Sequence, residues 1–433
     1  MAGLLKQKRI PLNRPMENLS HSDKSALWTN VIALAVLQGA IAFAWVAYRA
    51  YLPVLFEQVG LPGTEVPVSR GEDFLAIALE PMMGFWSDRY RATLGKRFSF
   101  VAVGVGIAAL ILLVLPAIAA GRSPIMGIIL TVLLIGWAIA MAAFRSPAIA
   151  LLRQYALETQ LAQSMGLLLF AMAMVGAFAQ PLQAFLLNLG APTALGGSSL
   201  VLVASAGVLR LVKPERKLGA IEIPEAPPSL GASVKTTPWT TAAQVLMMGV
   251  AIAWGLRLIV GSLAPVLTDT FPNLTPGPVI FTFLFTAACL AVPAGTLNSL
   301  WGLRKMVSGA ALLLMLTVTG LQTPLPPNAV IIFIVISLLG WTVVFNGAIP
   351  LAFLALTGDR GGLAVGSYFG GFAAGMALIN WTPFGGILET TSSRAGTSGI
   401  VFAAIAFLAF QLGRSRRLKT SQPSQSKSQS IKA

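Results

Sequence analysis

The chain has 433 residues, of which 56% are apolar and only 10% are charged. A soluble domain carries about 25% charged residues, and a disordered chain has low hydrophobicity, so the composition excludes both classes. A membrane-spanning helix needs about 20 mostly apolar residues, and the apolar content corresponds to about twelve such helices. The apolar blocks are unbroken, unlike the alternating strands of an outer-membrane barrel.

The apolar runs predict an all-α polytopic membrane protein with both ends of the chain on one side. The expected spans are 27–53, 72–87, 98–119, 125–147, 163–188, 195–212, 241–267, 278–300, 306–322, 329–355, 363–388 and 397–413. We expect them to group into an N-terminal segment at 1–26, a six-helix bundle at 27–212, a proline-rich linker at 213–240, a second six-helix bundle at 241–413 and a basic tail at 414–433.

The positive charges are distributed unevenly about these spans. Of 30 Lys and Arg residues, 24 fall in the termini and the loops on the terminal side, and only three fall in the opposite loops. The positive-inside rule therefore predicts cytoplasmic termini in the inner (plasma) membrane. This explains the net charge of +15 without a nucleic-acid partner. The remaining three, Arg49, Arg145 and Arg257, lie inside spans.

Several chemistries lack the residues they need. The single cysteine, Cys289, excludes an internal disulfide and a cysteine-based metal cluster, and the single histidine, His21, lies in the polar N-terminal segment. No phosphate-binding glycine loop occurs, and no cleavable signal is visible. We predict neither an enzyme nor a bound cofactor or metal; the expected partners are the lipid bilayer, a small polar solute, and a proton or other monovalent cation, with oligomeric state left open.

The two halves of the chain repeat a set of landmarks in the same order. Pro53-Val54-Leu55 matches Pro265-Val266-Leu267, and Pro81 matches Pro293. Further matches join Phe144 to Phe345, Gly166 to Gly366 and Pro181 to Pro383. The ordered set favours a tandem duplication into two pseudo-symmetric bundles. Parallel six-helix repeats around a central cavity are the plan of the major facilitator superfamily.

The loop after the second span carries the most specific motif, EPMMGFWSDRYRATLGKRFSFV, residues 80–101. It resembles the loop signature of the major facilitator superfamily through Gly84, Asp88, Arg89, Gly95, Lys96 and Arg97. Its start, Glu80-Pro81-Met82-Met83-Gly84, resembles the branch of glycoside–pentoside–hexuronide:cation symporters and sucrose–proton symporters. Residues 144–151 and the run from Gly362 to Gly386 are similar to the fourth and eleventh spans of that branch.

Two departures from the branch bear on its mechanism. Its cation symporters often have a second acid one turn before the acid-Pro pair, where this chain has Ala76. The aspartate usual in the fourth-to-fifth loop is replaced by Arg153-Gln154. A sodium site needs several converging oxygens, whereas a proton needs one carboxylate. The missing acid therefore favours protons.

Glu80 is the candidate for proton or cation coupling. It lies about 12 Å along the helix from Asp88, and a carboxylate at that depth must be protonated, paired or wetted. The alternative is a structural Glu paired with an arginine. The resemblance implies a cytoplasmic gate formed by Gly84, Asp88, Arg89, Gly95, Lys96, Arg97 and Arg145. We expect Asp88 to pair across the seam, with Arg145 as a partner; the alternative for the basic residues is topology retention.

The in-span polar and aromatic residues are candidates for a substrate cavity. They are Gln38, Tyr48, Arg49, Trp137, Gln180, Arg257, Asn298, Asn346, Asn380 and Trp381. Arg49 and Arg257 can hold a substrate carboxylate or phosphate, or pair with Glu80, although Arg49 can instead reach the outer surface. Amides and aromatic rings suit a sugar, but interhelical bonds and interfacial anchoring explain them equally well.

These expectations combine into a proton-coupled secondary transporter of a small polar solute, by resemblance a sugar or glycoside, working by alternating access. One alternative is a non-transporting member of the superfamily that delivers pigment or assembles light-harvesting complexes. Such a carrier has less need of Glu80, Arg145 and Arg257. A second alternative is a passive facilitator in which Glu80 is held permanently in an ion pair.

Overall fold

The computed structural model describes residues 21–94, 97–212, 238–388 and 390–414, and every regular element in these ranges is a helix. The elements are α1 (His21–Gln58), α2 (Glu65–Leu94), α3 (Arg97–Ala119), α4 (Pro124–Ala150), α5 (Leu152–Tyr155), α6 (Leu161–Ala177), α7 (Ala179–Leu189), α8 (Ala191–Leu211), α9 (Pro238–Thr270), α10 (Pro276–Trp301), α11 (Leu303–Gly320), α12 (Pro327–Ala355), α13 (Gly361–Trp381), the short 3₁₀ helix η2 (Pro383–Leu388) and α14 (Thr391–Arg414).

Most of these helices are suited to a bilayer by length and composition. Ten described helices are long and apolar enough to cross a membrane, and the pair α6 and α7, bent by 62°, adds an eleventh. The one remaining expected span, 72–87, corresponds to α2, which does not meet this standard because it carries charged residues along its length. It is also longer than predicted, 65–94 against 72–87.

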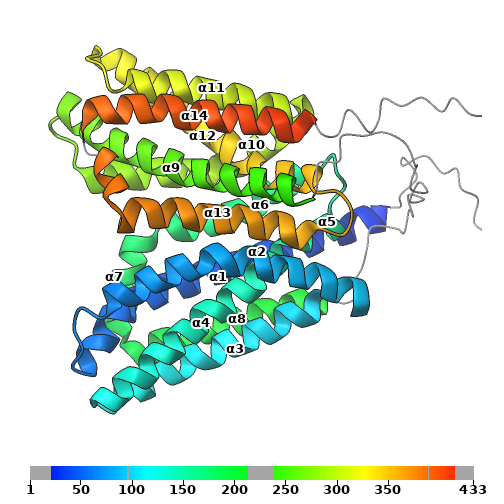
Figure 1. Ribbon diagram of the computed structural model, residues 1–433, viewed down its shortest axis with the longest axis vertical. Coiled ribbons are helices and arrows are strands. Elements are labelled where there is room, and N and C mark those ends of the chain that lie inside the picture. Colours follow the sequence, from blue (N-terminus) through cyan, green and yellow to red (C-terminus); the bar gives the residue numbers. More distant parts are fainter. Residues whose placement is uncertain (1–20, 95–96, 213–237, 389, 415–433) are drawn as a thin grey trace, which may run out of the picture.

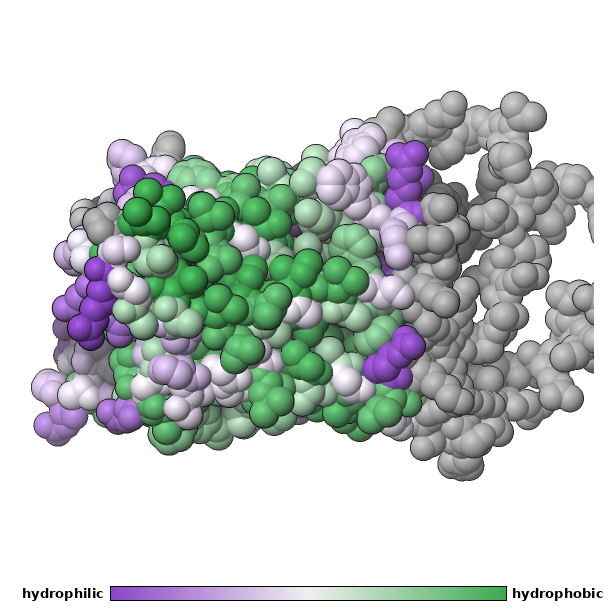
Figure 2. Space-filling model, turned by 90° about the horizontal axis from the view of Figure 1, so that it is seen from below, coloured by the Kyte–Doolittle hydropathy of each residue, from purple (hydrophilic) through white to green (hydrophobic). Residues whose placement is uncertain are grey.

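The surface confirms that the apolar faces are turned outward. Large apolar side chains of α3, α4 and α8 are strongly exposed, for example Leu110 at 62%, Ile128 at 66% and Leu200 at 69%. Figure 2 shows an apolar band between two polar ends on the face of the molecule that is seen from below. Such a continuous apolar surface is typical of a membrane-embedded protein.

The helices form two groups that meet along two seams. In Figure 1 the first group holds α1 to α4 and α8, and the second holds α9 to α14. The seams are formed where α2 packs on α13 and where α6 packs on α10. The groups lie closest at the end that carries His21 and Arg414, here called the terminal face, and they diverge toward the opposite face.

Several predicted boundaries are shifted. Helix α9 begins at Pro238, inside the expected linker. The expected span 363–388 is divided, because α13 ends at Trp381 and η2 follows. The rest of the linker, the beginning of the N-terminal segment and the tail after Arg414 lie outside the described residues.

Candidate functional site

A cavity of about 490 Å³ lies between α1, α2, α4 and α13, and we call it the α2 cavity. It extends along α2 from Glu65, near the opposite face, to Glu80 at the middle of the helix. Its walls are largely apolar, but they carry a concentration of charge that is rare at membrane depth. The charged lining residues are Arg49, Glu65, Glu72, Asp73, Glu80 and Arg145.

Glu80 is at the deep end of the α2 cavity, and its side chain is fully buried. One carboxylate oxygen accepts a hydrogen bond from Arg145 Nη2, and the other accepts one from Ser146 Oγ. Both partners come from α4. The Arg145 guanidinium also lies 4.5 Å from the ring centroid of Phe369 on α13. Glu80 therefore links α2 to α4, and its partner touches the second group of helices.

A second charged cluster lies nearer the opposite face. Arg49 of α1 is 3.5 Å from a Glu72 oxygen and 3.7 Å from an Asp73 oxygen, and it donates a 2.7 Å hydrogen bond to Ser69. The Tyr48 hydroxyl donates to the other oxygen of Glu72. One arginine is thus shared between two carboxylates. Arg49 lines the cavity and is held by acids, rather than only reaching the outer surface.

The predicted aromatic residues Tyr48 and Trp137 pack behind the residues that line the α2 cavity and do not face it. Trp137 is fully buried, and its ring stacks on Tyr48 at a centroid distance of 4.0 Å. Trp45, which lines the cavity, meets both rings edge-on. Tyr48 and Trp137 do not themselves line the cavity. Their packing fixes the Tyr48 hydroxyl that holds Glu72.

At the end of the α2 cavity near the opposite face, polar contacts connect the two groups of helices. The Trp381 indole nitrogen of α13 donates a 2.7 Å hydrogen bond to Asp73 of α2. The Arg70 guanidinium lies 5.0 Å from the centroid of the same indole ring. Trp381 and Asn380, both predicted cavity residues, therefore line the mouth of the α2 cavity.

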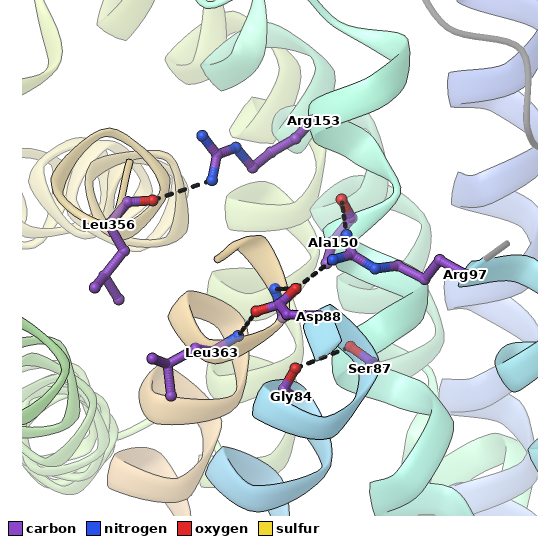
Figure 3. A network of polar contacts seen from close by, with 9 residues as sticks. Gly84, Ser87, Asp88, Arg97, Ala150, Arg153, Leu356 and Leu363 are labelled. Carbon is purple, nitrogen blue, oxygen red and sulfur yellow. Dashed lines mark hydrogen bonds and ion pairs between the residues drawn. The ribbon is translucent and has the colours of Figure 1, made fainter. Parts of the chain in front are cut away.

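At the terminal face, Asp88 joins four helices (Figure 3). Its carboxylate oxygens accept 2.8 Å hydrogen bonds from the backbone N–H groups of Gly362 and Leu363 in the first turn of α13. It also pairs with Arg97 of α3, which donates 3.1 Å to the carbonyl of Ala150. Asp88 reaches across the seam as expected, but its predicted partner was wrong: Arg145 lies deeper and pairs with Glu80.

The other predicted gate residues differ in position. Gly84 lies in the same seam, where its backbone touches that of Gly362 so closely that neither position has room for a Cβ. Arg89 is exposed at the same end of α2. Gly95 and Lys96 lie outside the described residues. Arg153, which we identified only as a departure, donates a 3.1 Å hydrogen bond across the seam to the carbonyl of Leu356 (Figure 3).

A second charged cavity lies on the far side of the α13 end. It measures about 630 Å³, is formed by α9, α13, η2 and α14, and is called the α9 cavity. Arg257 and Arg394 line it, together with Asn380 and Trp381, which it shares with the α2 cavity. Arg257 therefore does not pair with Glu80.

The remaining candidates are separate from both cavities. Asn298 and Asn346 are buried and donate to the carbonyls of Val343 and Ala291, so that they join α10 to α12. Gln38 is buried within α1, and Gln180 is exposed on α7. Among the described residues these four side chains bring no polar group to the α2 cavity.

No protein-family model and no curated protein matches the chain. Several solved structures are similar to the chain. A bacterial homologue of the iron transporter ferroportin, in an outward-facing state, has 18% identity and a TM-score of 0.63, covering 91% of this chain and 100% of its own. The major facilitator transporter FucP, in the outward conformation, has 14% identity, a TM-score of 0.59 and coverages of 89% and 99%. The human organic anion transporter TETRAN has 14% identity, a TM-score of 0.57 and coverages of 90% and 99%.

The protein has the major facilitator fold. The predicted fold class is therefore confirmed, and the chain is a multi-pass membrane protein. The likeness extends over most of every chain compared. It does not separate the symporter branch that the loop motifs resemble, because the neighbours handle an organic anion, iron or a sugar by their own descriptions.

Sequence analysis missed the acids at the start of α2. Glu65, Glu72 and Asp73 were placed at or before the edge of the span, although all three line the cavity. The spacing of the acids along α2 could have indicated that they share a face with Glu80. Asp73 precedes Glu80 by seven residues, which is two helical turns on nearly the same face. Ala76, the position of the missing family acid, lines the same cavity.

Proposed function

We propose that the protein is a secondary transporter that moves a small polar solute by alternating access and is coupled to protons through Glu80. Its moving parts would be the predicted bundles, 27–212 and 241–413, rocking about the α2 cavity. The fold supports this proposal, since solved neighbours are transporters caught in outward-facing states. The 24-to-3 distribution of positive charge supports an inner membrane with the terminal face in the cytoplasm.

The observation that carries the proposal is the Glu80–Arg145 pair at mid-height in a cavity. A buried carboxylate is stable either with its cationic partner or with a proton. Protonation would remove the charge that holds Arg145, and it would free a guanidinium that touches Phe369 of the second group. A single proton would thereby loosen a contact between the two groups. This chemistry needs one carboxylate, which agrees with Ala76 at the position of a second acid.

The test is uptake into proteoliposomes with and without an imposed pH gradient. For the wild type, an inward proton gradient should drive accumulation of its solute. Glu80→Gln should keep solute exchange across the membrane but lose accumulation driven by the gradient, because an amide cannot bind and release the proton. The matched control is Glu57→Gln, since Glu57 is an exposed acid at the end of α1. A Glu80→Gln protein that responded to the gradient like the wild type would refute the coupling role.

A passive facilitator is the second candidate, and the ion pair itself favours it. If Glu80 stays paired with Arg145 throughout the cycle, solute will equilibrate and the gradient will have no effect on the wild type. The pigment-assembly alternative predicts no solute movement at all. A cavity lined by six charged residues is a poor environment for an apolar pigment. The sugar or glycoside class stays a prediction from the resemblance.

A further inference from the structure

The two cavities that meet at the end of α13 have linings of opposite charge. The α2 cavity is lined by four acids and two arginines. Among the residues that the structure describes, the α9 cavity is lined by two arginines and no acid. Asn380 and Trp381 are common to both linings, so the cavities are neighbours across one short stretch of helix. The charge of the site is therefore divided in space, with an acidic side and a basic side.

Arg257 is the decisive residue of the basic side. It lies about 20 Å along α9 from Thr270, which is close to mid-height of that helix. Its side chain is exposed to the cavity and has no hydrogen-bond or ion-pair partner among the described residues. A guanidinium at this depth is unfavourable unless a countercharge or water satisfies it. An anionic group entering the α9 cavity would supply that countercharge.

On the acidic side, two buried carboxylate oxygens lack a hydrogen-bond donor. Glu72 is 4% exposed, and its Oε2 has no hydrogen-bond partner, although Arg49 lies 3.5 Å away. One buried oxygen of Glu65 likewise has none. Arg49 is shared between Glu72 and Asp73, so one positive charge serves two carboxylates. A cationic donor entering here would satisfy these oxygens, and the Trp45 ring, which already lies 5.5 Å from Arg49, offers a cation–π surface.

We propose that the solute is dipolar: a small zwitterion whose cationic group faces the carboxylates of the α2 cavity while its anionic group faces Arg257. The inference rests on the proposed transport function and names the class of solute. A purely cationic solute would leave Arg257 without a countercharge, and a purely anionic one would leave the Glu72 and Glu65 oxygens without donors. A neutral sugar could donate hydroxyl hydrogen bonds to these oxygens, but it would bring no countercharge to Arg257. An α-amino acid carries both groups within one small molecule, and its ammonium group has the N–H donors that a quaternary ammonium lacks.

The experiment compares solutes that differ only in charge. Purified protein in proteoliposomes is tested for uptake and counterflow of the common α-amino acids and glycine betaine, then of the amine and the carboxylate matched to the best of these. A panel of sugars and glycosides is run alongside. We expect one zwitterion to be transported, with its matched amine and carboxylate at least about tenfold weaker, as expected when one charged contact of a bound group is lost.

Variants locate the anionic end. Arg257→Gln should weaken the zwitterion about tenfold or more, and Arg257→Lys should restore part of the loss. Arg257→Glu makes both sides acidic, so it should reverse the preference and favour the matched amine over the zwitterion. This reversal cannot come from misfolding. The control is Arg122→Gln, an exposed arginine at the opposite face that lines neither cavity.

The outcomes separate the two proposals. If a sugar, or an amine or carboxylate alone, is transported better than every zwitterion, the dipolar solute is refuted while the transporter function stands. The same holds if Arg257→Glu leaves the preference unchanged. If no solute of any class moves, the transporter function itself fails, and the dipolar solute fails with it.

Discussion

Glu80 is fully buried at mid-height of α2, and side chains of a single other helix compensate its charge. Arg145 supplies the countercharge and Ser146, the next residue on α4, supplies a second donor. Removing one member of a buried pair leaves the other uncompensated, which costs about 3–5 kcal/mol, whereas neutralising both is far less costly. The pair is therefore fixed as a unit, and its two members should not behave independently.

Arg145→Gln is predicted to destabilise the protein by about 3 kcal/mol, because Glu80 is then left without its guanidinium partner. The double variant with Glu80→Gln should recover most of this loss, since two amides can hydrogen-bond without a buried charge. Thermal unfolding in detergent measures both. A double variant no more stable than Arg145→Gln alone would contradict the pairing. Arg122→Gln should leave the unfolding temperature unchanged, as its side chain is exposed.

At the scale of elements, α2 shows how a charged helix is accommodated in an apolar protein. Four of its five acids line the cavity, while Phe74 and Trp86 are exposed on its outer side. The half of α2 that lies nearer the terminal face packs on α13 through glycines of α13. A Cβ at Gly366 would lie against the carbonyl of Glu80, and a Cβ at Gly370 would lie against Pro81. Backbones therefore touch directly along this seam, as small residues permit in membrane helices.

Gly366→Val is predicted to destabilise the closed seam by about 1–3 kcal/mol, the typical penalty for overpacking. The added side chain would meet backbone atoms of Glu80 and Pro81, which cannot rotate away. The matched control is Gly106→Val on α3, where nothing lies within 4 Å of a new Cβ. Thermal unfolding should separate the two variants. Equal stability would mean that α2 and α13 are not in contact at Gly366.

The elements were more predictable than the site. Eleven of the expected spans correspond to helices, or to a bent helix pair, that are apolar enough to cross a membrane. The span predicted for α2 was too short because the first turns of this helix are charged. A hydropathy criterion excludes charged residues even where their side chains face a cavity inside the protein. Glu80, Asp88 and Arg145 were identified as unusual from sequence. Their partners were not, because the Glu80–Arg145 and Asp88–Gly362 contacts join residues far apart in the chain.

For the molecule as a whole, both seams are tight at the terminal face. Besides the α2–α13 seam, α6 and α10 touch through Gly166 against Ala291 and Gly295 against Ala162. Asp88 and Arg153 add hydrogen bonds across the terminal face. The groups diverge at the opposite face (Figure 1), where the bond from Trp381 to Asp73 spans the cavity mouth. This arrangement predicts that the α2 cavity is reached from the opposite face and blocked from the terminal face.

Cysteine labelling tests this state, starting from Cys289→Ser because the exposed Cys289 would react. Ala76→Cys places a thiol in the α2 cavity, and a membrane-impermeant reagent should modify it from the opposite face. Asp88→Ala removes two hydrogen bonds to α13 and the Arg97 pair, so it should shift the population toward opening at the terminal face, with labelling from that side rising several-fold.

The matched control for Asp88→Ala is Asp269→Ala, an exposed acid at the opposite-face end of α9, which should leave the labelling pattern unchanged. Labelling is compared in sealed membrane vesicles of both orientations, so the same data report which face is cytoplasmic. Equal labelling of Ala76→Cys from both faces in the unaltered background would contradict a closed terminal face. If the labelling pattern were unchanged in Asp88→Ala, the close glycine contacts alone would be holding the seam. The backbones of α2 and α13 would then stay packed together without the Asp88 carboxylate between them.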